Sequence, residues 1–322
     1  LPSKPKIFHG RESELEDIIQ LLAQDSPRLA ILGGGGMGKT SLARAVLHHP
    51  DTCAKFQERF FVSAEATTNA HQLATLTGLH LGLEPSGDPL RTVVHTFAEK
   101  EDPCLLVLDN LETPWEPRES CRGVEDFLAL LAGVKHLALI ITMRGSERPG
   151  KVQWTRPFLP PLQPLSDGAA QKTFDDITDD PHDSEEKIQL LRFTENMPLA
   201  VDLMAHLVDY EGVSNVLTRW QVEKTAVLSV GYTRNSNLDA SITTSFSSPR
   251  LTAGAKQLLS VLAVLPDGLS DIELMQINIL IPGIHSCKSA LLATSLAYKD
   301  TSSRLRSLVP IREHIHQFYP PS

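Results

Sequence analysis

The chain has 322 residues, 41% of them hydrophobic and 21% charged, with a formal net charge of −9 and a pI of about 5.7. This is ordinary globular composition in a chain long enough for two or three domains. The acidic balance excludes an overall basic field that would attract nucleic acid or anionic lipid, so we expect neither a nucleic-acid partner nor a membrane partner.

The location expected for this protein is the cytoplasm. Its most apolar stretch, residues 127–142, is interrupted by Lys135 and His136 and predicts a helix, a short loop and a strand, not a membrane span. Four scattered cysteines without a CxxC pair indicate a reducing compartment. Because the sequence begins at Leu1, with neither an initiator Met nor a signal peptide, we expect a fragment of a longer protein.

The first predicted element is an amphipathic helix in residues 8–24. Leu15, Ile18, Ile19 and Leu22 recur at helical spacing. Ser13 and Glu16 are spaced as a capping box for its first turn. A short apolar run at residues 29–32 follows and predicts a buried strand.

Residues 33–40, GGGGMGKT, match the phosphate-binding pattern GxxxxGK[ST] between that strand and a helical SLARAVL. Glycines allow successive backbone N–H groups to face an anion, and the helix beginning near Gly38 adds its positive dipole end. Lys39 would reach the β- and γ-phosphates, and the Thr40 hydroxyl would bind Mg²⁺. A plain glycine turn would leave the Lys-Thr pair unexplained. The predicted nucleotide contacts here are Gly33, Gly34, Gly35, Gly36, Met37, Gly38, Lys39, Thr40 and Ser41.

Further apolar runs predict strands at residues 59–63, 104–109 and 137–142, with a weak fifth around residues 152–159. Helical patterns separate them. Near-continuous apolar strands alternating with helices indicate an α/β fold with a parallel sheet covered on both faces. With the phosphate loop, this predicts an AAA+-like P-loop NTPase domain over residues 1–158.

The character of the chain changes after the proline-rich PFLPPLQPL. Helical patterns dominate and predict a small helical domain over residues 159–238. Further helices follow, one of which opens with a capping box in SDIEL. Two short strands around the polar turn of LAYKDTSSRLRSLV, followed by a helical IREHIHQFY, favour a winged helix over residues 239–322.

Asp109 ends the apolar run LLVLD and is the candidate magnesium partner of the loop. An aspartate at the carboxyl end of a parallel strand faces the ligand crevice, although such a residue can equally cap the next turn. The next residue is Asn110, where many ATPases place a carboxylate that activates water. Asn cannot accept a proton, so we expect slow hydrolysis. Glu112 is a fallback base or a solvated loop charge.

The fourth strand runs into ITMRGSERP, which places Thr142 and Arg144 at its carboxyl end beside the loop. Arg144 is suited to sensing a γ-phosphate because its guanidinium is always charged and pairs two oxygens. An arginine after a strand is also a common solvent-exposed residue. From the residues alone, both interpretations stay open.

Five motifs together resemble one family. FHGRESEL, GGGGMGKTSLA, LLVLDNLE, ITMR and NMPLA follow the order and approximate spacing of the signal-transduction ATPases with numerous domains (STAND). The likeness is specifically to the NB-ARC or NOD-like receptor module, most closely in its fungal versions, and it covers nearly the whole chain, including LAVLPDGLS at the start of the winged helix. It implies a role in innate immunity or programmed cell death.

The resemblance implies further nucleotide contacts. Phe8, Gly10 and Arg11 match the segment that holds the adenine through backbone contacts. Pro198 in NMPLA, followed by Leu199, matches the proline that packs on the adenine from the helical domain. Each also has a structural interpretation, Phe8 as a staple for the first helix and Pro198 as a helix start.

The chain departs from the family at its Met-His-Asp signature, whose histidine contacts the β-phosphate of ADP. Leu308 and Val309 stand where His and Asp are expected. Either Arg312 or His314 supplies the missing contact, or the closed form is held mainly by packing between domains.

The resemblance thus implies a switch that binds ADP at rest, exchanges it for ATP and self-associates, with Mg²⁺ as a cofactor and with sensor and effector domains outside these residues. An alternative is a DNA-acting ATPase or transcription regulator that reads DNA with its winged helix. A third hypothesis, an efficient metabolic ATPase or kinase, is disfavoured by Asn110 and by the lack of a second carboxylate beside Asp109.

Overall fold

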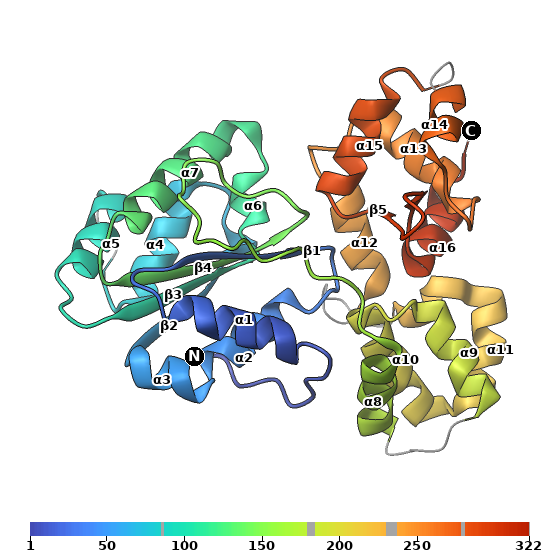
Figure 1. Ribbon diagram of the computed structural model, residues 1–322, viewed down its shortest axis with the longest axis horizontal. Coiled ribbons are helices and arrows are strands. Elements are labelled where there is room, and N and C mark those ends of the chain that lie inside the picture. The colour runs from blue at the N-terminus through green and yellow to red at the C-terminus, as the bar shows by residue number, and fades with distance from the viewer. Residues whose placement is uncertain (85–86, 179–183, 230–236, 278–280, 322) are drawn as a thin grey trace. The chain divides into compact units, whose positions relative to one another are not determined.

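The structure is a computed structural model that describes residues 1–84, 87–178, 184–229, 237–277 and 281–321. The chain separates into two compact units (Figure 1). The sheet unit comprises residues 1–33 and 39–162, and the helical unit comprises residues 34–38 and 163–322.

The sheet unit is an α/β structure with four parallel strands in the order β1-β4-β3-β2. Its strands are β1 (Arg28–Gly33), β2 (Glu58–Ser63), β3 (Cys104–Asp109) and β4 (Leu137–Arg144). Its helices are α1 (Glu12–Leu22), α2 (Lys39–Leu47), α3 (Pro50–Lys55), η1 (Ala64–Ala66), α4 (Ala70–His80), α5 (Pro89–Ala98), α6 (Glu112–Trp115) and α7 (Arg118–Ala132). The four strands predicted before residue 145 are therefore confirmed.

Helices cover both faces of this sheet, as the apolar strands require. In Figure 1, α1, α2 and α3 lie on one face, and α4, α5 and α7 lie on the other. On the second face Leu73, Phe97 and Phe127 from the helices pack with Leu106 and Leu108 of β3 in one buried cluster. Burial on both faces explains why β1, β3 and β4 read as unbroken apolar runs.

The predicted fifth strand around residues 152–159 is wrong, although every residue in that range is described. The chain does run beside β1, but it bonds to it only at separate points. Thr155 N donates to Arg28 O at 2.9 Å, and Leu162 N donates to Leu32 O at 2.7 Å. Prolines at positions 157, 160 and 161 lack the N–H that a continuous ladder needs.

The predicted capping box at the first helix is also wrong. Helix α1 begins at Glu12, and Ser13 Oγ donates to Glu14 Oε2 at 2.9 Å instead of capping the helix. The turn before the helix is made by Gly10, whose φ of +72° suits glycine. Gly10 N donates to Glu12 Oε1 at 3.2 Å, so Glu12, and not Glu16, is the acidic side chain that accepts a backbone N–H before the helix.

The helical unit contains α8 (Asp167–Thr178), α9 (Glu185–Thr194), α10 (Pro198–Glu211), α11 (Val213–Glu223), η2 (Lys224–Leu228), α12 (Leu238–Phe246), α13 (Ala253–Ala263), α14 (Asp271–Ile277), α15 (Ile284–Ala293) and α16 (Val309–Phe318). Strands β5 (Tyr298–Lys299) and β6 (Leu305–Arg306) form an antiparallel pair before α16, as predicted. The predicted capping box in SDIEL is confirmed. Ser270 N donates to Glu273 Oε2 at 2.7 Å, and Glu273 N donates to Ser270 Oγ at 3.3 Å.

The turn between α9 and α10 contains two consecutive left-handed residues. Glu195 and Asn196, between α9 and α10, both have left-handed backbones, with φ of 41° and 56°. Such a conformation is costly for a residue with a Cβ, and more so for Glu than for Asn. The Glu195 carboxylate accepts a hydrogen bond of 2.7 Å from Val309 N, the first residue of α16. The strained turn thereby links α9 to the start of α16.

None of the described helices combines the length and the apolar character that crossing a bilayer requires.

Candidate functional site

The candidate site lies at the carboxyl edge of the four-stranded sheet. Gly33 at the end of β1 pairs in register with Arg144 at the end of β4. Leu108 of β3 pairs with Ile141, so Asp109 and Thr142 follow side by side at the same edge. Ligands of parallel α/β sheets bind at this edge, because loops from neighbouring strands open there.

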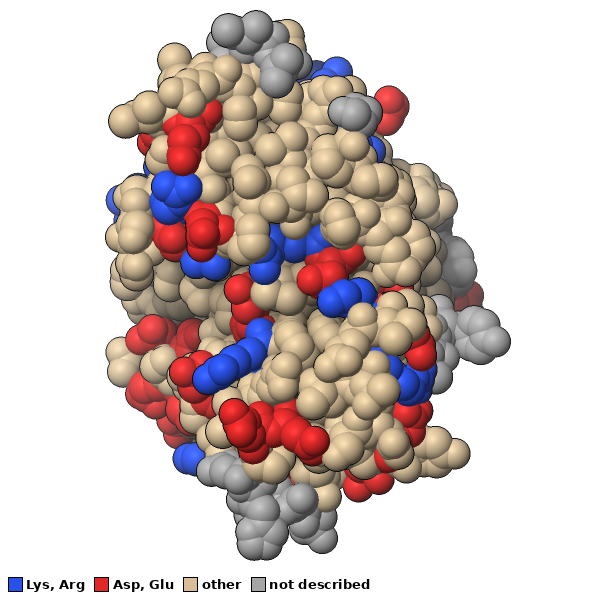
Figure 2. All heavy atoms as spheres, turned by 90° about the vertical axis from the view of Figure 1, so that its right-hand side faces the viewer, with Lys and Arg blue, Asp and Glu red and all other residues tan. Residues whose placement is uncertain are grey.

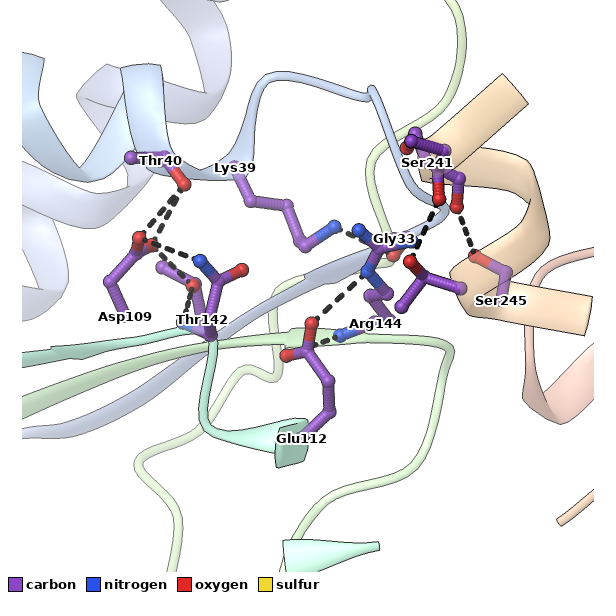
Figure 3. A network of polar contacts seen from close by, with 12 residues as sticks. Gly33, Lys39, Thr40, Asp109, Glu112, Thr142, Arg144, Ser241 and Ser245 are labelled. Carbon is purple, nitrogen blue, oxygen red and sulfur yellow. Dashed lines mark hydrogen bonds and ion pairs between the residues drawn. The ribbon is translucent and has the colours of Figure 1, made fainter. Parts of the chain in front are cut away.

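Lys39 is the first residue of α2, and its side chain turns back toward the end of β1 (Figure 3). Lys39 Nζ donates to Gly33 O at 3.0 Å. The pKa of Lys39 is lowered to about 8, chiefly by burial; Glu112 and Asp109 oppose this shift and Arg144 adds to it. A buried ammonium is costly without an anion, so this position favours a negatively charged ligand.

Asp109 receives two hydroxyl donors (Figure 3). Thr40 Oγ1 donates to Asp109 Oδ1 at 2.9 Å, and Thr142 Oγ1 donates to the same oxygen at 2.6 Å. Burial raises the pKa of Asp109, and these hydrogen bonds oppose the rise. Thr142 was placed beside the loop by the sequence, but its bond to Asp109 was not foreseen.

These residues fit a magnesium-nucleotide ligand. The described residues include no group of three or more His, Cys, Asp or Glu side chains placed to hold a metal ion. Mg²⁺ commonly binds through one or two protein oxygens together with waters and phosphate oxygens, which suits Thr40 and Asp109. A Cβ built on Gly38, whose φ is +82°, meets no atom within 4 Å, so the loop is open there.

Asn110 directly follows Asp109 with a left-handed backbone, φ 57°, which Asn tolerates better than most residues. Its backbone N donates to Thr142 Oγ1 at 3.1 Å, and its side-chain Nδ2 lies 3.4 Å from Asp109 Oδ2. The side chain therefore acts as a neutral donor to Asp109. An amide has no basic site with which to take a proton from water.

Glu112 is not a solvated loop charge. It begins α6, is 5% exposed, and forms an ion pair with Arg144, with Nε 3.1 Å from Oε1. Arg144 is likewise buried and not a solvent-exposed residue. The sequence offered both residues as separate candidates and gave no sign of the pair, because nothing in the spacing of 32 residues indicates that they touch.

Five loop residues, Gly34–Gly38, belong by their contacts to the helical unit. Leu199 N, in the first turn of α10, donates to Gly36 O at 3.1 Å. A Cβ on Gly36 would lie 2.9 Å from Leu199 Cβ, and φ there is +75°, so only glycine fits. Pro198 is the first residue of α10, so its predicted helix-start role is confirmed.

The other predicted loop contacts lie near these. Met37 is buried, Gly35 is half-buried, and Ser41 lies in the first turn of α2. Phe8, Gly10 and Arg11 precede α1. Arg11 is buried and pairs with Glu14, with Nη1 2.9 Å from Oε1.

Leu308 is a buried residue at the N-cap of α16, and the Val309 amide is bound by Glu195. His314 lies deeper in the helical unit. Its Nδ1 is 2.6 Å from Asp239 Oδ1, and its Nε2 is 3.2 Å from Thr243 Oγ1. Both ring nitrogens of His314 therefore have partners inside the helical unit.

Residues 2–152 match the model of a family described as Novel STAND NTPase 1. No curated protein matches the chain.

Among solved structures, a Walker-type ATPase of Pyrococcus abyssi has a TM-score of 0.66 at 13% identity, with 99% of each chain covered. The ORC2 protein of Aeropyrum pernix, solved in ADPNP-ADP complexes, has a TM-score of 0.56 at 14% identity, covering 97% of this chain and 94% of that one. The ORC1 protein of the same organism, solved in complex with DNA, has a TM-score of 0.54 at 14% identity, covering 98% and 94%.

These likenesses at low identity establish the fold. The chain has the parallel-sheet α/β fold of P-loop ATPases, and residues 2–152 are similar in sequence to a STAND NTPase.

Proposed function

We propose that the chain is the nucleotide-dependent switch of a STAND signalling receptor of the NB-ARC or NOD-like type, bound to ADP at rest and to ATP when active. The observation that carries the proposal is the group formed by Lys39, Thr40 and Asp109, with Asn110 where a catalytic carboxylate is expected. Such a site holds a nucleotide well and hydrolyses it poorly. When bound, Mg²⁺ would neutralise phosphate charge beside Thr40 and Asp109.

Slow turnover follows from the two nearest candidate bases. Asn110 cannot take a proton, and both carboxylate oxygens of Glu112 accept hydrogen bonds from Arg144. General-base catalysis contributes typically about 10²- to 10⁴-fold, so its loss leaves a weak ATPase. Turnover of several per second at saturating ATP and Mg²⁺ would contradict this and favour an efficient metabolic ATPase.

Contacts of the loop support a coupling between the nucleotide and the helical unit. Gly36 accepts from Leu199 at the start of α10, next to Pro198, the residue that we propose packs on the adenine. A ligand bound by the loop would therefore affect α10 directly. Differential contacts of ADP and ATP with Arg144 and α10 would bias the conformation, which is the physical requirement of a switch.

We further propose that Phe8, Gly10 and Arg11 hold the adenine. The domains in this scheme are the nucleotide-binding domain over residues 1–158, the helical domain over 159–238 and a winged helix over 239–322. The receptor would work in the cytoplasm, with sensor and effector domains outside these residues.

The test is mass spectrometry of nucleotide released from purified protein, with ADP expected in near-equal molar ratio. Lys39→Ala should lose this nucleotide and the thermal stabilisation that it gives, because a ligand bound only to the native state stabilises it. Lys55→Ala is the matched control, since Lys55 also donates to backbone carbonyls, at the end of α1. A Lys39→Ala protein retaining as much ADP as wild type would refute the site.

A second candidate, a DNA-binding ATPase, is favoured by the fold shared with the ORC1 protein solved on DNA. The charges oppose it. Residues 241–322 hold seven Lys and Arg against five Asp and Glu. Several are paired, including Lys288 with Asp271 and Arg304 with Glu273. On the face of the helical unit in Figure 2, basic side chains are interspersed with acidic ones. Salt-dependent binding to duplex DNA at low micromolar concentration would reverse this ranking.

A further inference from the structure

The ion pair between Glu112 and Arg144 has an unusual geometry. Arg144 Nε donates to Glu112 Oε1 at 3.1 Å, and Arg144 N donates to Oε2 at 3.3 Å (Figure 3). One carboxylate is thus bound by the side chain and the main chain of the same residue. The Glu112 and Arg144 side chains are only 6% and 10% exposed, so solvent screens the pair little.

These two contacts restrict the rotation of the Arg144 side chain more than a single contact at the Nη end of its guanidinium would. A guanidinium is planar, and it has five N–H donors in a rigid fork. Holding Nε against Oε1 while the backbone N holds Oε2 restricts the rotation of the whole group. The Arg144 guanidinium is therefore held in a defined orientation at the end of β4.

The same pair also sets the charge at this edge of the sheet. Lys39 and Arg144 are cationic, and Asp109 and Glu112 are anionic. Lys39 interacts electrostatically with all three of the others. A third phosphate placed near Arg144 would share the guanidinium with the Glu112 carboxylate. Glu112 therefore offsets part of the attraction that Arg144 exerts on an additional anion.

We propose that Glu112 is a positioning residue that lowers the preference of this site for a nucleoside triphosphate over a diphosphate by holding and neutralising Arg144. This inference rests on the proposed function, because it requires that the loop binds adenine nucleotide. It gives Glu112 a role different from that of a general base, since its two oxygens are directed at Arg144.

The experiment is isothermal titration of wild type and Glu112→Gln, each first freed of bound nucleotide, with ADP and with the non-hydrolysable analogue ADPNP, each with Mg²⁺. Gln keeps an acceptor for Arg144 Nε but removes the negative charge. The expected result is an ADPNP-to-ADP affinity ratio raised about tenfold, within the usual range of coupling between sites. A general loss of stability would weaken both nucleotides alike and leave the ratio unchanged.

A double-mutant comparison shows whether Glu112 acts through Arg144. Arg144→Gln and Glu112→Gln/Arg144→Gln should have the same ratio within about twofold. This comparison also serves if Glu112→Gln alone fails to fold, since the double variant contains no buried charge at either position. Glu125→Gln is the matched control, because Glu125 accepts from Trp115 and Gly150 away from the loop. Its ratio should equal that of wild type.

Three outcomes would overturn the inference. An unchanged ratio in Glu112→Gln would remove any role in discrimination. If Glu112→Gln raised the ADPNP-to-ADP affinity ratio equally in the wild-type and Arg144→Gln backgrounds, Glu112 would act by repelling the phosphate directly and not through Arg144. Unchanged binding with abolished turnover would make it a base. In those three outcomes the wild type still binds nucleotide, so the proposed function stands. If the wild type bound neither nucleotide, the proposed function would fail together with this inference.

Discussion

Lys39 shows how a single buried charge predisposes the loop to bind phosphate. Its pKa is lowered to about 8 chiefly by burial, so the native state binds this proton less tightly than the unfolded chain does. The unfolded state then binds more protons between about pH 8 and pH 10.5, and stability rises with pH across that window. Below pH 8 the cost of the buried charge is fully present, unless an anion offsets it.

We therefore predict that nucleotide binding takes up a proton near pH 8. Phosphate oxygens beside Lys39 would raise its pKa again, with an uptake of roughly half a proton at that pH. Calorimetric titration in two buffers of different ionisation enthalpy measures this number. The same titration at pH 7 is the control, because Lys39 is then largely protonated before the nucleotide binds and has little proton left to gain. Zero uptake by the wild type would mean that Lys39 does not contact the phosphates.

The sequence predicts some residues of the site but not all of the contacts between them. Lys39, Thr40 and Asp109 belong to local patterns whose chemistry is fixed by spacing, and the structure brings them together. The bond between Thr142 and Asp109 depends on the register of β3 and β4. A parallel register is set by packing of whole strands, so a linear pattern does not contain it.

At the scale of elements, helix α16 is capped by a distant residue. Leu308 at its N-cap has no side chain that can accept a hydrogen bond, and the Glu195 carboxylate binds the amide of Val309 instead. Glycine would adopt the left-handed backbone of position 195 at less cost than Glu. Retaining Glu there is consistent with a cap that outweighs the backbone strain.

Glu195 variants should follow a defined order of stability. We predict that Glu195→Ala loses about 1 kcal/mol of unfolding free energy, the usual value of a helix cap. Glu195→Gly should lose less than Ala because it relieves the positive φ, and Glu195→Gln should lose least. Urea denaturation measures the series. If Glu195→Ala were as stable as wild type and Glu195→Gly more stable, only the backbone would matter and the cap would contribute nothing.

A second link between elements joins α12 to α16 through Asp239 and His314, 2.6 Å apart. Burial by itself would raise the pKa of Asp239, but the hydrogen bond and charge of His314, together with Ser229, outweigh it and hold the pKa below its usual value of 3.8. A depressed pKa gives stability that is present above pH 3.8 and is lost as pH falls through the native-state value.

Asp239→Asn should accordingly be destabilised at pH 7 by about 2 kcal/mol, the usual loss of a hydrogen bond to a charged group. The difference from wild type should shrink below pH 4 and vanish where Asp239 is protonated in both states. Chemical denaturation at pH 7, 5 and 3 follows this. Asp267→Asn, an exposed position in the same unit, should show no such trend. A difference independent of pH would indicate lost packing rather than lost charge.

Helix starts were predicted less consistently than strands, as the two predicted capping boxes show. The capping box of Ser270 and Glu273 formed as expected, whereas that of Ser13 and Glu16 did not, because Gly10 allowed the chain to turn earlier. The same spacing was therefore right once and wrong once. The difference came from Gly10, which lies outside the motif and lets the chain turn before α1, so the spacing of the motif alone could not predict it.

At the scale of the whole molecule, the proposed switch predicts a change of assembly. Purified protein with ADP should sediment as a monomer, and exchange for ADPNP with Mg²⁺ should shift it to larger species, since a ligand favours the state that it binds more tightly. Analytical ultracentrifugation at matched protein concentration measures this. Arg144→Gln should shift less than wild type. Equal sedimentation with both nucleotides would contradict ATP-driven self-association.

The proline-rich segment beside β1 has a consequence for solubility. An uncovered edge strand presents unpaired N–H and C=O groups, on which strands of other molecules can add. Here Thr155 and Leu162 bond to that edge at separated points, and the prolines between them offer few donors to an approaching strand. The segment therefore closes one side of the sheet without extending it, and protects against strand-by-strand aggregation at the edge that carries the phosphate loop.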